Sequence, residues 1–534
     1  MPTSSSTADT MPLRRACLAA VISLPPVRLL VVLPVLPLLL VVSVGCGTNE
    51  STDVQAVHSA QSSSTSTPAG SDPHDRTRPA DDPESAPGDA PPGIGPGGVG
   101  WRYQQPADGR SLGDLLAQAP APTETTAVRV PINETLVASA GIRKLDGQHI
   151  TLYTDLPSDD HVDELPQVFD QAVPHWQQYF ALDQSKLAEW KIIGYVIQDR
   201  EKFRAVGLLP DDLPPFLHAY QRGEEIWVYE QPSAYFRRHL LLHEGTHSVM
   251  NHLLGGSGPP WYMESIAELL GTHHWENGRL QMGYVPRNKE EVPYWGRVKI
   301  VRDHVDAGRA KALSAVMAHR LQDYLQVDPY GWSWAAAAFL DAHPLSQEAF
   351  RQLGRRTDSV DFSARFRQQL DDEWPRLAEQ WQLFVMNIDY GYDVAREAVI
   401  YGEGESFVGE TATAEIVVDR GWQSSGVRLE ADRSYRIEAT GRYQVASEPR
   451  TWWCEPNGVT IRYHGGQPLG ILLAAMRDDQ PAERLTSLAR PAEIGLGRTI
   501  TPGRSGTLYL RINDHPAELA DNEGTVTVTV RVLP

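Results

Sequence analysis

The segment LLHEGTHSVM, residues 241–250, holds two histidines four positions apart and a glutamate directly after the first. On a helix, residues i and i+4 lie on the same face, one turn apart. His243 and His247 can therefore present neutral imidazoles to one Zn²⁺ ion, with Glu244 beside them to take a proton from a zinc-bound water that attacks a carbonyl. Chance also produces this pattern. Together with His239, the two histidines equally form a stripe that suits a solvated or hydrogen-bonded helix face, so the motif needs a third ligand.

The flanks of the motif predict a helix hairpin. A helix over 233–256 has Ser233 as a candidate N-cap and Gly255 as a candidate stop. The turn GGSGPP (255–260) then leads into the amphipathic segment WYMESIAELLGTHHW (261–275). The turn is short enough for the second helix to fold back on the first.

Two glutamates of the second predicted helix are candidates for the third ligand. Glu264 and Glu268 are one helical turn apart. Either carboxylate would complete a His₂Glu site with one open position for water. The spacing alone leaves both glutamates open.

These two motifs resemble the gluzincin metallopeptidases, especially their peptidase MA-like branch. In that family a Trp-containing Glu-Gly-x-Ala helix follows HExxH, and its first Glu is the third ligand. Trp261, Glu264 and Ala267 match this pattern, whereas Ser265 replaces the usual Gly. The resemblance implies an α+β zinc metallopeptidase domain over 101–395, mostly helical after the HExxH helix, with Glu264 as ligand. It gives the second glutamate the task of holding a ligand histidine in its tautomer.

Gluzincins usually add a Tyr or His from a downstream helix to stabilise the oxyanion. Tyr330 precedes an Ala-rich helical segment at a similar place and is the candidate, with His273 and His274 as competitors. The predicted strand EEIWVYEQ (224–231) is the candidate edge strand that holds an extended peptide. Further strands are predicted over 149–155 and 191–199, and helices over 164–180, 333–343 and 372–388.

After residue 392 the sequence changes to short alternating β runs separated by turn residues, which predicts an all-β sandwich over 405–534. Within it, GTLYLRINDHPAELADNEGTVTVTV (506–530) reads as strand, loop and strand. The loop is rich in oxygen donors, as a Ca²⁺ site requires. A plain polar turn explains the same residues, because Asn, Asp and Gly are default turn residues.

The loop resembles that of the PA-IL-like, galactose-binding lectin family, a small jelly-roll-like β-sandwich in which Ca²⁺ binds vicinal sugar hydroxyls. Asp514, Asp521 and Asn522 match the family's calcium ligands. Glu518 stands where the family donates a backbone oxygen, and Tyr443 matches a residue that contributes its backbone carbonyl. The family's sugar-contacting stretch is not reproduced, and only His464 and Gln467 offer polar groups there.

The N-terminal 46 residues have the features of an export signal. Arginines precede an apolar run over 29–44 that ends in VSVGC. This ending resembles a bacterial lipobox, with Cys46 as the lipidated residue and Ser43 where Leu is preferred. A plain cleaved signal or an N-terminal anchor remains the alternative. Residues 47–100 lack Leu, Phe, Tyr and Trp, which predicts a disordered linker.

The composition of the chain limits the classes of molecule that we expect it to bind. The chain has 534 residues, three cysteines and a net charge of −20. Such acidity excludes nucleic acid as an expected partner. The two metal-ligand motifs and the N-terminal signal together predict an exported, lipid-anchored zinc metallopeptidase of the cell envelope, which acts on a peptide or protein. A calcium-dependent lectin-like module would bind glycans. The alternatives are an inactive peptidase fold that serves as a glycan- or protein-binding adhesin-like surface protein, and a sandwich that is only a structural cap.

Overall fold

The structure is a computed structural model that describes residues 131–478 and 485–534. The predicted signal over 1–46 with Cys46 and the predicted linker over 47–100 lie outside the described residues. Within the described ranges, no helix is both long enough and apolar enough to cross a membrane.

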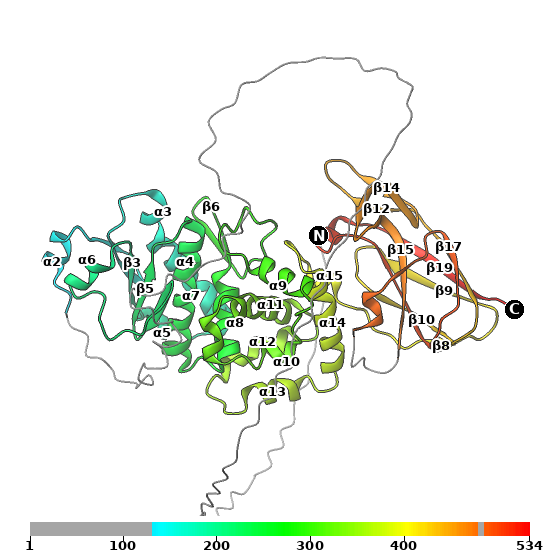
Figure 1. Cartoon of the computed structure of the whole chain (residues 1–534), viewed down its shortest axis with the longest axis horizontal. Coiled ribbons are helices and arrows are strands. Elements are labelled where there is room, and N and C mark those ends of the chain that lie inside the picture. The colour runs from blue at the N-terminus through cyan, green and yellow to red at the C-terminus, as the bar shows by residue number, and fades with distance from the viewer. Residues whose placement is uncertain (1–130, 479–484) are drawn as a thin grey trace, which may run out of the picture. The chain divides into compact units, whose positions relative to one another are not determined.

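A five-stranded mixed sheet comes first, with the strand order β1-β2-β3-β5-β4. Figure 1 labels two of its central strands, β3 and β5. The three central strands are parallel, and both edge strands run antiparallel to their neighbours. The predicted strand over 224–231 is internal, which corrects the expectation that it forms the edge: a left-handed turn at Gly223 folds an additional strand, β4, onto it. The strands are β1 (Arg143–Asp146), β2 (Ile150–Thr154), β3 (Ile192–Ile197), β4 (Ala219–Arg222) and β5 (Glu225–Tyr229).

Both faces of this sheet are buried, and the side chains of β5 show how. Ile226 and Val228 belong to the main core of the helical region, whereas Trp227 between them belongs to a smaller core on the opposite face. This follows from the alternation of side chains along a strand. The helices before the motif are α2 (Glu134–Ser139), α3 (Asp160–Asp163), α4 (Leu165–Phe180), α5 (Gln184–Ala188) and α6 (Arg200–Ala205).

The predicted helix hairpin is present. The first helix, α7 (Ala234–Val249), begins after Ser233, whose side chain accepts a hydrogen bond from the backbone of Phe236. It continues as a π-helical turn, η1 (Met250–Leu254), and stops at Gly255 in the left-handed conformation. The second helix, α8 (Pro260–Gly271), ends four residues before the predicted limit. The chain then forms the hairpin β6 (His273–Glu276) and β7 (Arg279–Met282).

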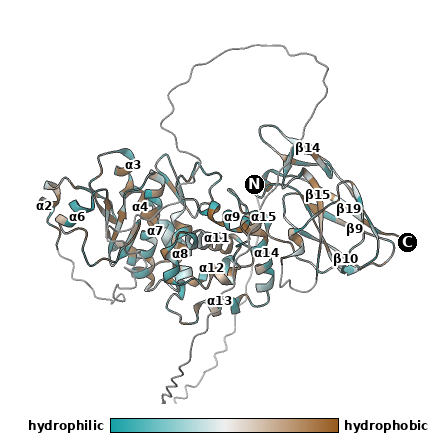
Figure 2. Cartoon of the chain, viewed as in Figure 1, coloured by the Kyte–Doolittle hydropathy of each residue, from teal (hydrophilic) through white to brown (hydrophobic). Residues whose placement is uncertain are grey.

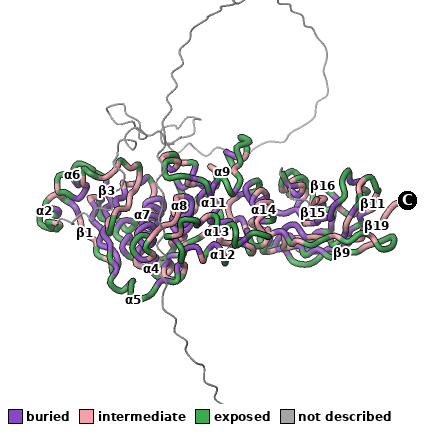
Figure 3. Tube along the Cα trace, turned by 90° about the horizontal axis from the view of Figure 1, so that it is seen from below, coloured by how far each residue is buried: buried purple, intermediate pink, exposed green. Residues whose placement is uncertain are grey.

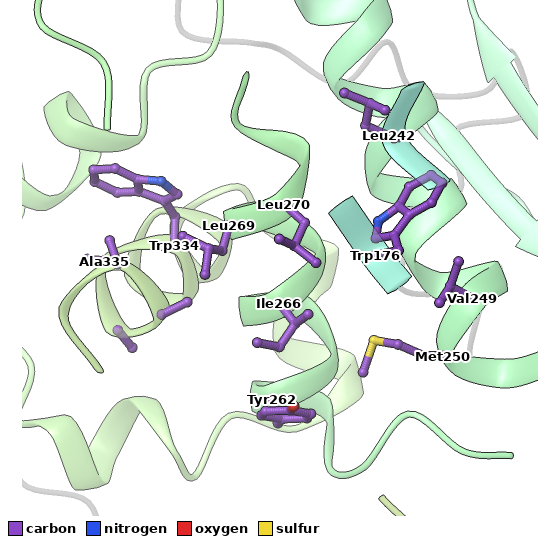
Figure 4. Close-up of a cluster of buried hydrophobic side chains, with 14 of the residues drawn as sticks. Trp176, Leu242, Val249, Met250, Tyr262, Ile266, Leu269, Leu270, Trp334 and Ala335 are labelled. Carbon is purple, nitrogen blue, oxygen red and sulfur yellow. The ribbon is translucent and has the colours of Figure 1, made fainter. Parts of the chain in front are cut away.

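Helix α8 is packed between α7 and α11 (Asp328–Ala342) and is largely buried (Figure 3). Figure 4 shows the contact side chains, such as Leu242 of α7, Ile266 of α8 and Trp334 of α11, each at most 1% exposed. The remaining helices are α9 (Arg297–Asp306), α10 (Leu313–Val316), η2 (Leu321–Leu325), α12 (Gln347–Gln352), η3 (Leu353–Arg355), α13 (Phe362–Gln369), α14 (Trp374–Asn387) and α15 (Val394–Glu397).

The C-terminal region is a β-sandwich, as predicted. One sheet has the order β14-β15-β18-β10-β8 with β16 beside β15, and the other has the order β17-β11-β19-β9. Strand β19 (Thr525–Val532) alternates three buried valines with more exposed residues, as expected when one face meets the core. Figure 2 colours this region by hydropathy. The other elements are β8 (Glu405–Ser406), β9 (Thr411–Val417), β10 (Gln423–Leu429), β11 (Tyr435–Thr440), β12 (Tyr443–Ala446), β13 (Trp452–Cys454), β14 (Asn457–His464), β15 (Gln467–Arg477), η4 (Ser487–Ala489), β16 (Ala492–Glu493), β17 (Gly497–Ile500), β18 (Gly506–Ile512) and η5 (Leu519–Asp521). The fold is thus a helical α+β region followed by an all-β region.

Candidate metal centre

Two glycines allow the helices of the motif to pack closely. A Cβ atom on Gly245 would lie 2.7 Å from Phe169 and 2.8 Å from Trp176 of α4. A Cβ atom on Gly271 of α8 would lie 3.1 Å from the ring of His239 on α7. Gly245 therefore allows α7 to approach α4, and Gly271 brings the histidines of α7 against the glutamates of α8.

Three atoms from these helices converge. His243 Nε2 lies 3.0 Å from His247 Nε2, and the carboxylate oxygen Oε2 of Glu264 lies 3.3 Å from the first nitrogen and 3.6 Å from the second. Ligand atoms about 2.0–2.1 Å from a tetrahedral zinc ion are separated by roughly 3.3 Å. The triangle therefore has the size that a zinc site requires, and all three residues are buried.

The carboxylates around His243 favour a positive charge in the cluster, which a bound proton supplies and a metal ion would replace. Burial opposes ionisation of Glu264, but the positive charges of the neighbouring His247 and His243 imidazoles outweigh it and hold its pKa at about 2. Burial likewise disfavours a charged His243, but the neighbouring glutamates outweigh burial and raise the pKa of this imidazole to about 10. Glu264 Oε2 is buried and has no hydrogen-bond partner among the described residues. Two ring nitrogens 3.0 Å apart and a free carboxylate oxygen are an arrangement that a shared cation satisfies.

Glu244 and Tyr330 also lie at this cluster. Burial raises the pKa of Glu244, although the two neighbouring histidines act in the opposite direction. A raised pKa suits a group that must both accept and return a proton near neutral pH. The ring of Tyr330 is centred 6.2 Å from that of His243. Burial, and then the negative charges of Glu264 and Glu244, raise the pKa of Tyr330 well above its ordinary value, so its hydroxyl remains a hydrogen-bond donor.

Glu268, the alternative ligand, is engaged elsewhere. Its two oxygens accept hydrogen bonds from Arg297 Nε at 2.8 Å and Nη2 at 2.9 Å. Its Oε1 lies 3.4 Å from Nδ1 of His243, and its Oε2 lies 3.6 Å from Nε2 of His239. His239, His243 and Glu268 form the second of two groups with metal-ligand spacing in the described residues. Because Arg297 occupies that carboxylate, the group with Glu264 is the better metal site.

Two further histidines near the motif, one from the histidine stripe and one a candidate for the oxyanion role, are buried. His239 is fully buried, so the histidine stripe does not lie on a solvated face. His273 is buried in β6, where its Nδ1 lies 2.8 Å from the carbonyl of Gly271 and its Nε2 accepts a hydrogen bond from Arg238. Arg297 was not found from the sequence, because no spacing rule connects it to the motif.

The oxygen-rich loop of the sandwich brings together some of its predicted residues. Asn522 Nδ2 donates to Oδ2 of the buried Asp514 at 2.8 Å. Asp521 Oδ2 accepts a hydrogen bond from the backbone of Ser447 at 2.9 Å. The carboxylate of Glu518 points elsewhere, because Arg462 Nη2 binds both of its oxygens.

Tyr443 lies beside this loop. A Cβ atom on Gly524 would lie 3.1 Å from the Cβ of Tyr443. The Tyr443 hydroxyl donates to the carbonyl of Gly470 at 2.5 Å. Its side chain is therefore occupied within the sandwich, which leaves only its backbone for the role that the resemblance implies.

Comparisons with known proteins give distant similarities only. No family model matches the chain, and no curated protein matches its sequence. The structure described as the EclA N-terminal domain, a PllA-like lectin, is 22% identical and covers 23% of this chain and 95% of its own, with a TM-score of 0.18.

Two structures of the IMPa metallopeptidase also match. The Pseudomonas aeruginosa protein in complex with an O-glycopeptide is 14% identical, over 47% of this chain and 25% of its own, with a TM-score of 0.15. The complex with T-antigen is 12% identical, over 74% of this chain and 43% of its own, with a TM-score of 0.14. This chain therefore covers less than half of either peptidase chain.

Proposed function

We propose that the protein is a zinc metallopeptidase that hydrolyses peptide bonds. The observation that carries the proposal is the buried triangle of His243 Nε2, His247 Nε2 and Glu264 Oε2, with sides of 3.0, 3.3 and 3.6 Å. Two imidazoles and one carboxylate are the protein ligands of a catalytic zinc site that keeps one position open. Bound Zn²⁺ supplies Lewis acidity, which polarises a carbonyl and makes water more acidic.

The residues around the triangle have distinct tasks in this proposal. Glu244 takes a proton from the attacking water and returns it to the leaving amine. Tyr330 donates its hydroxyl hydrogen to the oxygen on which negative charge develops. Glu268 holds the imidazole of His243 in the tautomer that keeps Nε2 available.

The second part of the proposal is a calcium-dependent, glycan-binding role for the sandwich. Asp521 Oδ1 and Asn522 Oδ1 are buried and have no hydrogen-bond partner among the described residues. Unpaired buried oxygens are costly, and a Ca²⁺ ion satisfies such atoms. Binding of glycans on a substrate would raise its effective concentration at the peptidase site. Export and lipidation at Cys46 complete the proposal.

The Glu244→Gln variant tests the peptidase function. Gln keeps the size of the side chain but cannot take the proton, so we expect cleavage to fall by about 10²–10⁴-fold while zinc content stays at the wild-type level. The substrates are a peptide library and the same peptides carrying O-linked sugars, each assayed with and without EDTA.

The main alternative is an inactive peptidase fold that acts as a binding protein. A wild-type chain that carries stoichiometric zinc yet cleaves neither peptide set would favour it. A sandwich that binds glycans equally poorly with calcium and with EGTA would instead be only a structural cap.

A further inference from the structure

We propose that Arg297 is the positioning residue that assigns different tasks to the two glutamates of α8: it leaves Glu264 free for the metal and withholds Glu268 from it. This inference rests on the proposed zinc peptidase function and deepens it.

Both glutamates reach the same imidazole. Glu264 Oε2 lies 3.3 Å from Nε2 of His243, and Glu268 Oε1 lies 3.4 Å from Nδ1 of that ring. Both glutamates are buried, at 6% and 1% exposure. They are one turn apart on one helix, so their position on α8 does not by itself decide which of them binds the metal.

Arg297 provides the difference between them. Arg297 is 6% exposed, and its guanidinium binds Glu268 through two parallel hydrogen bonds of 2.8 and 2.9 Å. This planar fork engages both oxygens of one carboxylate at once, which a lysine cannot do. Glu264 has no such partner, and its Oε2 remains free of hydrogen bonds among the described residues.

The backbone before Arg297 is held in the geometry that delivers this side chain. Arg297 is the first residue of α9, and Gly296 before it has φ 65°. Tyr294 also has a positive φ of 70°, which is uncommon for a bulky residue. Between them, Trp295 is packed edge-on against Trp334 of α11, and its carbonyl accepts a hydrogen bond from Arg297 Nη1 at 3.0 Å. Such held backbone positions are typical of functional sites.

The guanidinium also contacts the candidate oxyanion residue. Its central carbon lies 5.7 Å from the ring centroid of Tyr330, within the range of a cation–π contact. One arginine thus contacts both the carboxylate that orients His243 and the tyrosine on α11. Without it, Glu268 would be a buried carboxylate free to bind a metal ion with His239 and His243, in competition with the site that contains Glu264.

The test is a double-mutant cycle on the full chain, with the zinc dissociation constant as the main readout, measured by competition with a chromophoric chelator. The variants are Arg297→Gln, Glu268→Gln and the double variant. Arg302→Gln is the matched control, because Arg302 lies on the same helix but pairs with Asp389 at the surface. We expect Arg297→Gln and Glu268→Gln each to weaken zinc binding by about 10–100-fold, the double variant to be no weaker than Glu268→Gln, and the control to stay within about twofold.

Two further measurements separate positioning from folding. In cobalt-substituted Arg297→Gln, a ligand set that Arg297 no longer fixes should change the visible absorption bands from those of the wild-type chain. If that variant does not fold, Arg297→Lys decides, because it keeps the charge and loses the fork; zinc binding weakened at least fivefold is then the expected result.

Several outcomes would overturn the inference. The first is wild-type zinc affinity in an Arg297→Gln variant that folds. The second, if Arg297→Gln does not fold, is wild-type zinc affinity in Arg297→Lys. The third is a double variant whose loss of zinc affinity equals the product of the two single losses. A wild-type chain that binds no zinc overturns both this inference and the proposed function. Zinc binding without peptidase activity overturns only the function, since the affinity cycle can still be read.

Discussion

The two candidate metal sites of this chain differ in what their donor atoms already bind. At the helix pair, His243, His247 and Glu264 converge within 3.0–3.6 Å, and the glutamate oxygen has no competing hydrogen bond. In the sandwich loop, Asp514 accepts a hydrogen bond from Asn522, and Glu518 is paired with Arg462. Rigid helices preassemble a small, directional zinc site. A loop between two strands instead satisfies much of its polarity internally, and a calcium ion would have to complete the rest.

Glutamate substitutions in the two regions give the largest expected contrast. We expect Glu264→Gln to weaken zinc binding by about 100-fold or more, because it removes the anionic member of the triangle. Glu518→Gln should leave calcium affinity within about threefold, because that carboxylate is engaged by Arg462. Isothermal titration of each metal measures both. Equal losses of zinc affinity in Glu264→Gln and calcium affinity in Glu518→Gln would contradict the difference between the two sites.

Substitution of two arginines of the sandwich compares a buried ion pair with an exposed one. Arg511 binds Glu397 through two hydrogen bonds of 2.9 and 2.8 Å, and the side chains are 11% and 7% exposed. Arg511→Gln leaves the buried carboxylate of Glu397 without its ion-pair partner and should lower the free energy of unfolding by about 3–5 kcal/mol.

The matched control is Arg462→Gln, whose pair with Glu518 is 41% and 39% exposed and should cost less than about 1 kcal/mol. Urea unfolding of the full chain measures both variants. A larger loss of unfolding free energy in Arg462→Gln would show that the stability of the sandwich depends on its oxygen-rich loop rather than on the buried pair of Arg511 with Glu397.

The smallest expected effect concerns a buried imidazole outside the metal cluster. Burial lowers the pKa of His273 to about 3, with the charge of Arg238 acting in the same direction. The unfolded chain, with a histidine pKa near 6.5, binds the proton more readily. The stabilisation is therefore complete above about pH 6.5 and is lost as pH falls towards 3, by about 2 kcal/mol at pH 5. His273→Gln should flatten the pH dependence of unfolding by this amount; an unchanged slope between pH 7 and 5 would contradict it.

The helix hairpin was predictable from the sequence because local chemistry determines it. Ser233 caps the start, Gly255 ends the π-helical turn, and the i, i+4 spacing brings His243 and His247 to one face. The edge strand was not predictable in the same way. A turn at Gly223 adds β4 outside the strand that the alternating pattern indicated.

The metal centre was predictable only in part. The sequence supplied both glutamates, but it could not show which of them a distant residue binds. Arg297, 29 positions after Glu268, answers that question in three dimensions. In the loop of the sandwich, Glu518 is also paired with an arginine distant in sequence, Arg462, 56 positions away, which binds it through Nη2 alone. Ion pairs between residues distant in sequence cannot be predicted from the spacing of residues within a motif.

Anomalous X-ray scattering at the zinc edge, from crystals of the wild-type chain, tests the central claim most directly. We predict one peak about 2.0–2.2 Å from His243 Nε2, His247 Nε2 and a carboxylate oxygen of Glu264. A peak between His239 and Glu268, or no peak in zinc-loaded crystals, would contradict the account.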